Sequence, residues 1–181
     1  MEKVQKKRFR INLLAGTVLC IIALLLSVFL LASLPFGNNT VALIFGLLGW
    51  FLLWFFTHDL AHFVAGIVVG IRFQYYYLGR SDIIKLKGIV PDSLEQMLIV
   101  LGLKIARDKS RAGKTGFAAM YLAGPLASML TPFAVPIILL KDSVNVAGLL
   151  LLTISIINLV FTLWFSPKVG CIYKAKKALK Q

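Results

Sequence analysis

The sequence is poor in the residues from which most enzyme and metal sites are built. Its 181 residues include 7 acidic side chains, 2 histidines and 2 cysteines. The cysteines, Cys20 and Cys171, fall in an apolar run and beside a basic tail, so we do not expect a disulfide between them. Any site that uses charge or metal ligation must therefore draw on a handful of positions.

Hydrophobic residues, by contrast, make up 59% of the chain, and the mean hydropathy is +0.87. A soluble domain of this size does not have so high a share of apolar residues, so the composition predicts a polytopic membrane protein. The net charge is +13, and all but one of the 20 basic residues lie in segments 1–10, 72–114 and 167–181. This distribution is the loop bias of membrane proteins, and the sequence has no patterning typical of a nucleic-acid surface.

Four apolar runs are long enough to cross a bilayer as helices. We predict that they belong to one membrane domain over residues 1–181 and that they contact the lipid bilayer. Because the basic segments lie at both ends and after the second run, the positive-inside rule places both termini and loop 72–115 in the cytoplasm. The predicted spans are residues 11–34, 41–71, 116–140 and 146–165.

The loop pattern predicts a small β-hairpin followed by a surface helix. Aromatic residues alternate from Phe73 to Tyr77, a turn follows at residues 79–82, and residues 83–87 form the second strand. Over residues 91–109 apolar side chains recur at helical spacing and basic residues close the far end, which favours an amphipathic helix on the membrane surface. A solvated loop helix that packs on the bundle stays open as the alternative. The predicted fold class is an all-α polytopic membrane protein of about four transmembrane helices, with a cytoplasmic β-hairpin and an amphipathic surface helix.

The second apolar run contains His58-Asp59-Leu60-Ala61-His62, which holds both histidines and the only acidic residue inside any long apolar run. Helical residues four apart lie on one face about 6 Å apart, so both imidazoles can reach one metal ion. An ionisable group at membrane depth is costly and indicates a function. Polar packing, haem binding and proton relay stay open, although two histidines on one face of a helix cannot take opposite axial positions on one iron.

Two further patterns lie in the later spans. Gly124-Pro125-Leu126-Ala127-Ser128 combines small residues, which let another helix approach closely, with a proline that frees a backbone carbonyl. The fourth span carries Asn158 and ends at Ser166-Pro167.

Together these patterns resemble the site-2 protease family of intramembrane zinc metalloproteases. The family's His-Glu-x-x-His motif is matched with Asp59 in place of Glu, and its Gly-Pro-x-x-Asn motif with Ser128 in place of Asn. The third motif places Asn on a helix before Pro and Asp-Gly, and Asn158 and Ser166-Pro167 resemble it. Val169 stands where the family has the Asp that ligates zinc.

The resemblance implies a zinc ion held by His58 and His62, and hydrolysis of a peptide bond in or near the membrane. Asp59 would be the catalytic base that takes a proton from water. A catalytic zinc normally has three protein ligands, so the set is one short, and Cys171 is the candidate for the extra ligand. The residues implied in substrate contact or in the structure of the site are Gly124, Pro125, Ser128 and Asn158.

Three functions stay open at this point. The first is a zinc-dependent intramembrane metalloendopeptidase, a hydrolase that cleaves transmembrane or membrane-proximal segments. The second is a catalytically inactive pseudoprotease that binds a partner helix as a subunit of a membrane complex. The third is a membrane subunit that carries haem or metal.

Overall fold

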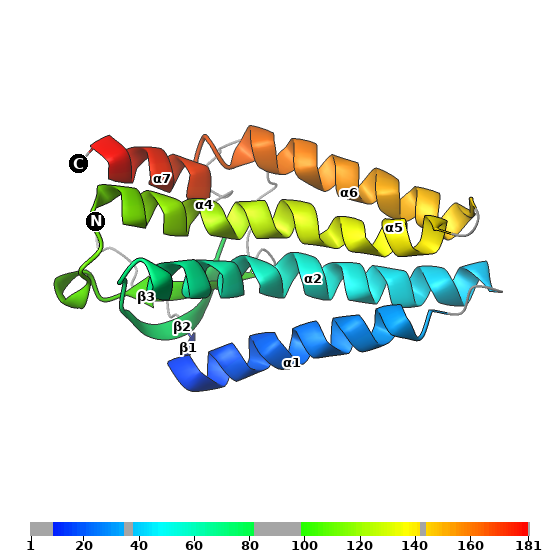
Figure 1. Ribbon diagram of the computed structural model, residues 1–181, viewed down its shortest axis with the longest axis horizontal. Coiled ribbons are helices and arrows are strands. Elements are labelled where there is room, and N and C mark those ends of the chain that lie inside the picture. The colour runs from blue at the N-terminus through cyan, green and yellow to red at the C-terminus, as the bar shows by residue number, and fades with distance from the viewer. Residues whose placement is uncertain (1–8, 35–37, 82–98, 142–143, 181) are drawn as a thin grey trace, which may run out of the picture.

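Helices that run along one common axis make up most of the chain (Figure 1). The computed structural model describes residues 9–34, 38–81, 99–141 and 144–180. The helices are α1 (Leu13–Ala32), α2 (Asn39–Val68), α4 (Lys114–Leu130), α5 (Ala134–Leu140), α6 (Val146–Phe165) and α7 (Cys171–Lys180). The strands and short 3-10 turns are β1 (Phe9–Asn12), β2 (Phe73–Arg80), β3 (Ile99–Ile105), η2 (Arg107–Lys109) and η3 (Thr131–Phe133).

Four helical stretches are long and apolar enough to cross a membrane, and they lie close to the four predicted spans. The buried share of their most apolar windows is only 22% in the first and fourth and 44% in the third. Their apolar side chains therefore form the outside of the bundle, which is the arrangement expected where lipid surrounds the helices. The stretches are Leu13–Ala32, Asn39–Val68, Lys114–Leu140 and Val146–Phe165.

Three of these helices begin at an asparagine whose side-chain oxygen accepts a hydrogen bond from the first turn. Asn12 accepts from the backbone of Leu14 at 2.9 Å, and Asn145 accepts from Gly148 at 2.7 Å. Asn38 accepts two such bonds at the start of α2. These caps satisfy N–H groups that a helix leaves without partners, so the helix starts are set by local sequence.

Helix α2 is the central element of the bundle. It packs against α1 on one side and α4 on the other, and it also contacts α6 (Figure 1). Helix α7 packs along α4 at the end where α2 finishes. Both histidines therefore lie on the helix with the most neighbours, facing partners that come from distant parts of the chain.

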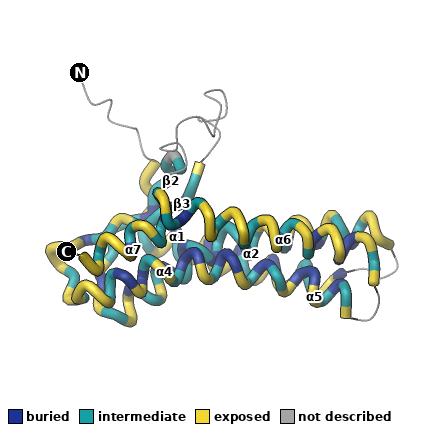
Figure 2. Tube along the Cα trace, turned by 90° about the horizontal axis from the view of Figure 1, so that it is seen from above, coloured by how far each residue is buried: buried dark blue, intermediate teal, exposed yellow. Residues whose placement is uncertain are grey.

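A small antiparallel sheet, in the order β1-β2-β3, lies beside the α7 end of the bundle (Figures 1 and 2). Tyr76 in its central strand is fully buried and packs with Cys20 of α1 and Leu101 of β3. Gly16 makes this packing possible, because a Cβ there would stand 2.3 Å from the Tyr76 ring. The sheet is thus joined to the helices through one buried aromatic side chain.

The predicted surface helix over residues 91–109 is wrong for its described part. Residues 99–105 form strand β3, which pairs with β2 in a register that sets Leu103 opposite Tyr76. Leu101 and Ile105 are four apart and suit a helix, but they also suit the alternation of a strand, in which Leu101 is buried. Pairing with β2, which lies outside the window, decides between the two periods.

Two further expectations about the ends of the sheet and chain are corrected. Within the described residues the sheet has three strands rather than the two of a hairpin, because residues 9–12 pair with β2 instead of ending the basic segment 1–10 and beginning the span 11–34. The predicted strand at 83–87 lies outside the described residues. The basic tail after residue 167 includes helix α7, which was not predicted from the sequence.

Candidate metal centre

His58 and His62 lie one turn apart on α2, and their rings meet edge to face with centroids 4.7 Å apart. Their Nε2 atoms are 3.2 Å from each other. The spacing of four residues alone puts both rings on one face of the helix. It does not decide which ring nitrogens meet, and that depends on the neighbouring helix.

Helix α4 fixes both rings through their Nδ1 atoms. Nδ1 of His62 is 2.6 Å from the backbone carbonyl oxygen of Met120, which can only accept, so this nitrogen carries the proton. Nδ1 of His58 is 3.0 Å from Oγ of Ser128, and that hydroxyl also donates to the carbonyl of Pro125 at 3.3 Å. Ser128 thus accepts from His58. Both Nε2 atoms are left with lone pairs that point toward one position, and a bound cation would relieve their repulsion.

Cys171 brings a third donor to the same position from the far end of the chain. Its Sγ atom is 3.4 Å from Nε2 of His62 and 3.6 Å from Nε2 of His58. Ser166 holds the start of α7 in place, because its Oγ accepts from the backbone of Ile172 and its carbonyl from Tyr173. Cys171 is the first residue of α7, and the dipole at the N-terminus of a helix favours the negatively charged thiolate.

His58, His62 and Cys171 therefore form a group that could hold a metal ion, with ligand atoms within 4.8 Å of one another. A tetrahedral zinc with bonds of about 2.0 Å to nitrogen and about 2.3 Å to sulfur would set two nitrogens about 3.3 Å apart and nitrogen and sulfur about 3.5 Å apart. The observed separations are 3.2 Å between the two nitrogens and 3.4 and 3.6 Å between sulfur and nitrogen, which are close to these expected values. Nitrogen and thiolate donors are also the set that zinc prefers. The donor chemistry and the spacing both fit zinc.

The Gly-Pro motif lies directly against this group. A Cβ at position 124 would stand 2.2 Å from Nε2 of His62, so only glycine lets the ring sit against α4. Pro125 is fully buried and its carbonyl accepts from Ser128. Asn158 donates from Nδ2 to the carbonyl oxygen of Ser128 at 3.0 Å, which links α6 to the same turn of α4. The four motif residues thus surround and support the histidines.

Asp59 is 4% exposed and does not belong to the three-donor group. Lys174 lies one turn after Cys171 on α7, and its positive charge interacts electrostatically with Asp59 and with both histidines.

A cavity of about 350 Å³ opens beside α7, next to the residues that flank Cys171. Val169, Tyr173 and Lys174 line it from the α7 side, and Tyr121 lines it from α4. Val169 therefore faces open space rather than supplying a ligand. The cavity lies at the end of the bundle where basic residues gather, and Arg107, Lys174 and Lys177 are among its lining residues.

Three contributors to the site were missed in the sequence. Met120 acts through its backbone carbonyl, which leaves no sequence signal at all. Ser166 caps α7, and a serine five residues before a basic amphipathic helix was a signal that could have been used. Lys174 was visible only as one of several lysines in a tail, and its position depends on α7 being helical.

Comparison of the chain with protein-family models, with curated proteins and with solved structures finds no match in any of the three. The site itself therefore has to carry the functional conclusion.

Proposed function

We propose that this chain is a zinc-dependent peptidase of the membrane interior, similar in design to the site-2 proteases, in which Cys171 supplies the third ligand. The observation that carries the proposal is the spacing of the three donor atoms, whose separations of 3.2, 3.4 and 3.6 Å suit a tetrahedral zinc. Three protein ligands leave one position of such an ion open, as catalytic rather than structural zinc sites do.

When bound, zinc supplies a Lewis acid that polarises a peptide carbonyl and activates water. The chain supplies the remaining groups. His58 and His62 hold their Nδ1 protons toward Ser128 and Met120, which would leave both Nε2 atoms free to hold a zinc ion. Asp59 is the group proposed to accept the proton of the attacking water, because it is a buried carboxylate that follows His58 directly on α2.

The position of the group in the bundle supports a substrate that is itself a membrane segment. His62 lies in the last third of α2 and His58 lies just before that third. This helix is apolar enough to span a membrane, and Arg72 and the basic residues of the following loop come after its end. A site at this depth is reached by peptide that lies in or next to the membrane. The substrate class is therefore a transmembrane or membrane-proximal segment with a locally unwound backbone, because a helix protects its peptide bonds.

A second candidate is a helix-binding protein that has kept the metal group without the catalysis. The observation in its favour is that the carboxylate of Asp59 lies outside the three-donor group, on a side chain one methylene shorter than the Glu of the family motif. Metal binding is common to both candidates, so it cannot distinguish them. A measurement of peptide cleavage can.

The deciding experiment compares wild-type protein with Asp59→Asn, which keeps the shape of the side chain and removes its charge. Both are purified without chelators, their zinc content is measured, and each is incubated with a transmembrane peptide that carries a helix-breaking Gly-Pro pair. We expect equal zinc content and a loss of cleavage of about 10²- to 10⁴-fold in Asp59→Asn, as for loss of a general base. Equal zinc without cleavage by either protein would favour the helix-binding candidate, and zinc absent from both would reject the proposal.

A further inference from the structure

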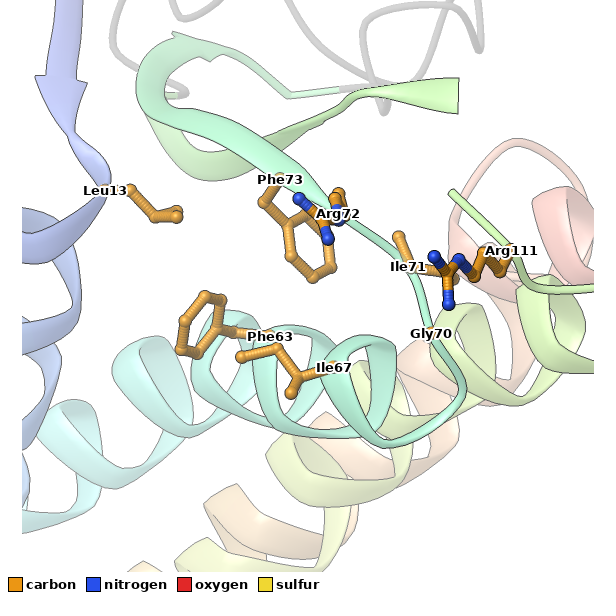
Figure 3. A pocket seen from close by; sticks show the side chains of 8 residues that line it. All are labelled: Leu13, Phe63, Ile67, Gly70, Ile71, Arg72, Phe73 and Arg111. Atoms are coloured by element: carbon orange, nitrogen blue, oxygen red, sulfur yellow. The ribbon is translucent and has the colours of Figure 1, made fainter. Parts of the chain in front are cut away.

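A second cavity, of about 480 Å³, lies where the last turns of α2 meet the segment that follows that helix (Figure 3). Phe63 and Ile67 of α2 face the segment that carries Arg72 and Phe73, with Leu13 of α1 at one end and Arg111 at the other. None of the described residues that line it belongs to the metal group. The cavity thus has an apolar floor and a basic rim.

The basic rim is built by a fixed turn of the backbone. Gly70 has φ of +84°, a conformation that side chains disfavour, and its carbonyl accepts from the backbone of Arg111 at 2.9 Å. The backbone of Arg72 donates to Ser110 at 3.0 Å. These bonds tie the segment after α2 to the segment before α4, so the backbones that carry the two arginines are held next to each other. Among the described residues no acidic side chain lines the cavity or forms an ion pair with either arginine.

The apolar floor is open to the surroundings of the bundle. Phe63 and Phe73 face each other with ring centroids 5.7 Å apart, and Ile67 is 54% exposed. The cavity sits where α1 begins and α2 ends, which is the level at which the apolar stretches Leu13–Ala32 and Asn39–Val68 stop. A ligand at this level would meet hydrocarbon on one side and water on the other.

We propose that this cavity binds an anionic phospholipid, with the phosphate between Arg72 and Arg111 and an acyl chain along Phe63, Ile67 and Leu13. Guanidinium groups bind phosphate oxygens through paired, charge-assisted hydrogen bonds, and basic pockets at the ends of membrane helices take acidic headgroups. An apolar floor continuous with a basic rim matches a lipid better than a small soluble anion. Binding here does not depend on peptidase activity.

The test titrates the purified protein in non-ionic detergent with dioleoyl phosphatidylglycerol and with dioleoyl phosphatidylcholine, and counts bound lipid by native mass spectrometry. The target variant is Arg72→Gln with Arg111→Gln. The control is Lys176→Gln with Lys180→Gln, which removes the same charge from exposed positions of α7 outside the cavity. Both arginines are exposed, so the fold is expected to survive, and an unchanged zinc content checks it.

We expect wild type and control to prefer the anionic lipid about tenfold, and the arginine variant to lose that preference. A parallel arm adds glycerophosphoglycerol, the headgroup without chains, which is expected to compete poorly. If the control variant loses its preference for the anionic lipid as much as the arginine variant does, the preference depends on net charge alone, and the proposal is overturned. Competition by the bare headgroup as effective as that by the lipid would overturn the assignment to a phospholipid.

Discussion

The Sγ atom of Cys171 lies 3.4 Å from Nε2 of His62, although 109 residues separate the two in the chain. This contact turns a pair of histidines into a three-donor group. A Cys171→Ser variant should therefore lose zinc affinity by more than the about 10- to 100-fold that loss of an outer hydrogen bond costs. Competition with a chromophoric chelator measures the change.

Cobalt substitution gives that prediction a specific signature. Cobalt bound to wild-type protein should show the near-ultraviolet charge-transfer band of a thiolate ligand, and Cys171→Ser should not. Cys20→Ser is the matched control, because Cys20 is buried between α1 and the sheet and is not part of the group. A thiolate band that persists in Cys171→Ser would show that sulfur does not ligate from this position.

Ser128→Ala tests the orientation of His58. Without the hydroxyl, Nδ1 of His58 loses its acceptor, and we expect zinc affinity to fall about 10- to 100-fold while the helices stay folded. Ser155→Ala is the control, since Ser155 is equally buried in a membrane helix but accepts from the indole of Trp50. Equal affinity in Ser128→Ala and wild type would mean that packing alone orients the ring.

Gly124→Ala tests the close approach of α4 to the histidine. The new methyl would stand 2.2 Å from Nε2 of His62, so the ring must turn away or the helices must separate. We expect loss of zinc together with a destabilisation of about 1–3 kcal/mol from overpacking, read from metal content and thermal unfolding. Gly113→Ala, with nothing within 4 Å of its new methyl, should leave the zinc content unchanged. Full zinc content in Gly124→Ala would contradict the observed packing.

Burial, with smaller contributions from the charges of Cys20 and Asp59, raises the pKa of Tyr76 from 10.0 to about 12. The folded chain therefore keeps this proton over a range where the unfolded chain releases it. The free energy of unfolding should fall as pH rises from 10 toward 12. Tyr76→Phe should show a smaller drop in melting temperature between pH 9 and pH 11.

The control for the tyrosine is Tyr173→Phe, which removes a phenol that is 47% exposed on α7. Its pH dependence should match that of wild type, because the buried phenol of Tyr76 is present in both proteins. The same pH dependence in Tyr76→Phe and wild type would show that another group governs alkaline unfolding.

The direction of insertion is the remaining prediction. The basic segments favour a cytoplasmic position for the end of the bundle that holds α7 and the sheet. In a cysteine-free background, an impermeant thiol reagent added to intact cells should label Asn39→Cys at the start of α2 and spare Arg111→Cys at the opposite end. Labelling of Arg111→Cys alone would reverse the orientation.

The sequence by itself determined the features that depend on neighbouring residues. Hydropathy over about 20 residues located the four apolar stretches, because crossing a bilayer requires that length. The spacing of four residues put His58 and His62 on one face of α2, because a helix repeats every 3.6 residues. Neither inference needed any contact between distant segments.

Tertiary structure decided the rest. Ile99–Ile105 suited both a helix and a strand, and only pairing with β2 selected the strand. Cys171 lies in a basic tail whose path the local sequence did not predict. It reaches the histidines because Ser166 accepts a hydrogen bond from the first turn of α7, and α7 packs against α4. The protons of His58 and His62 were placed by a serine and a backbone carbonyl on another helix. Each of these depends on how separate segments pack, which local periodicity does not encode.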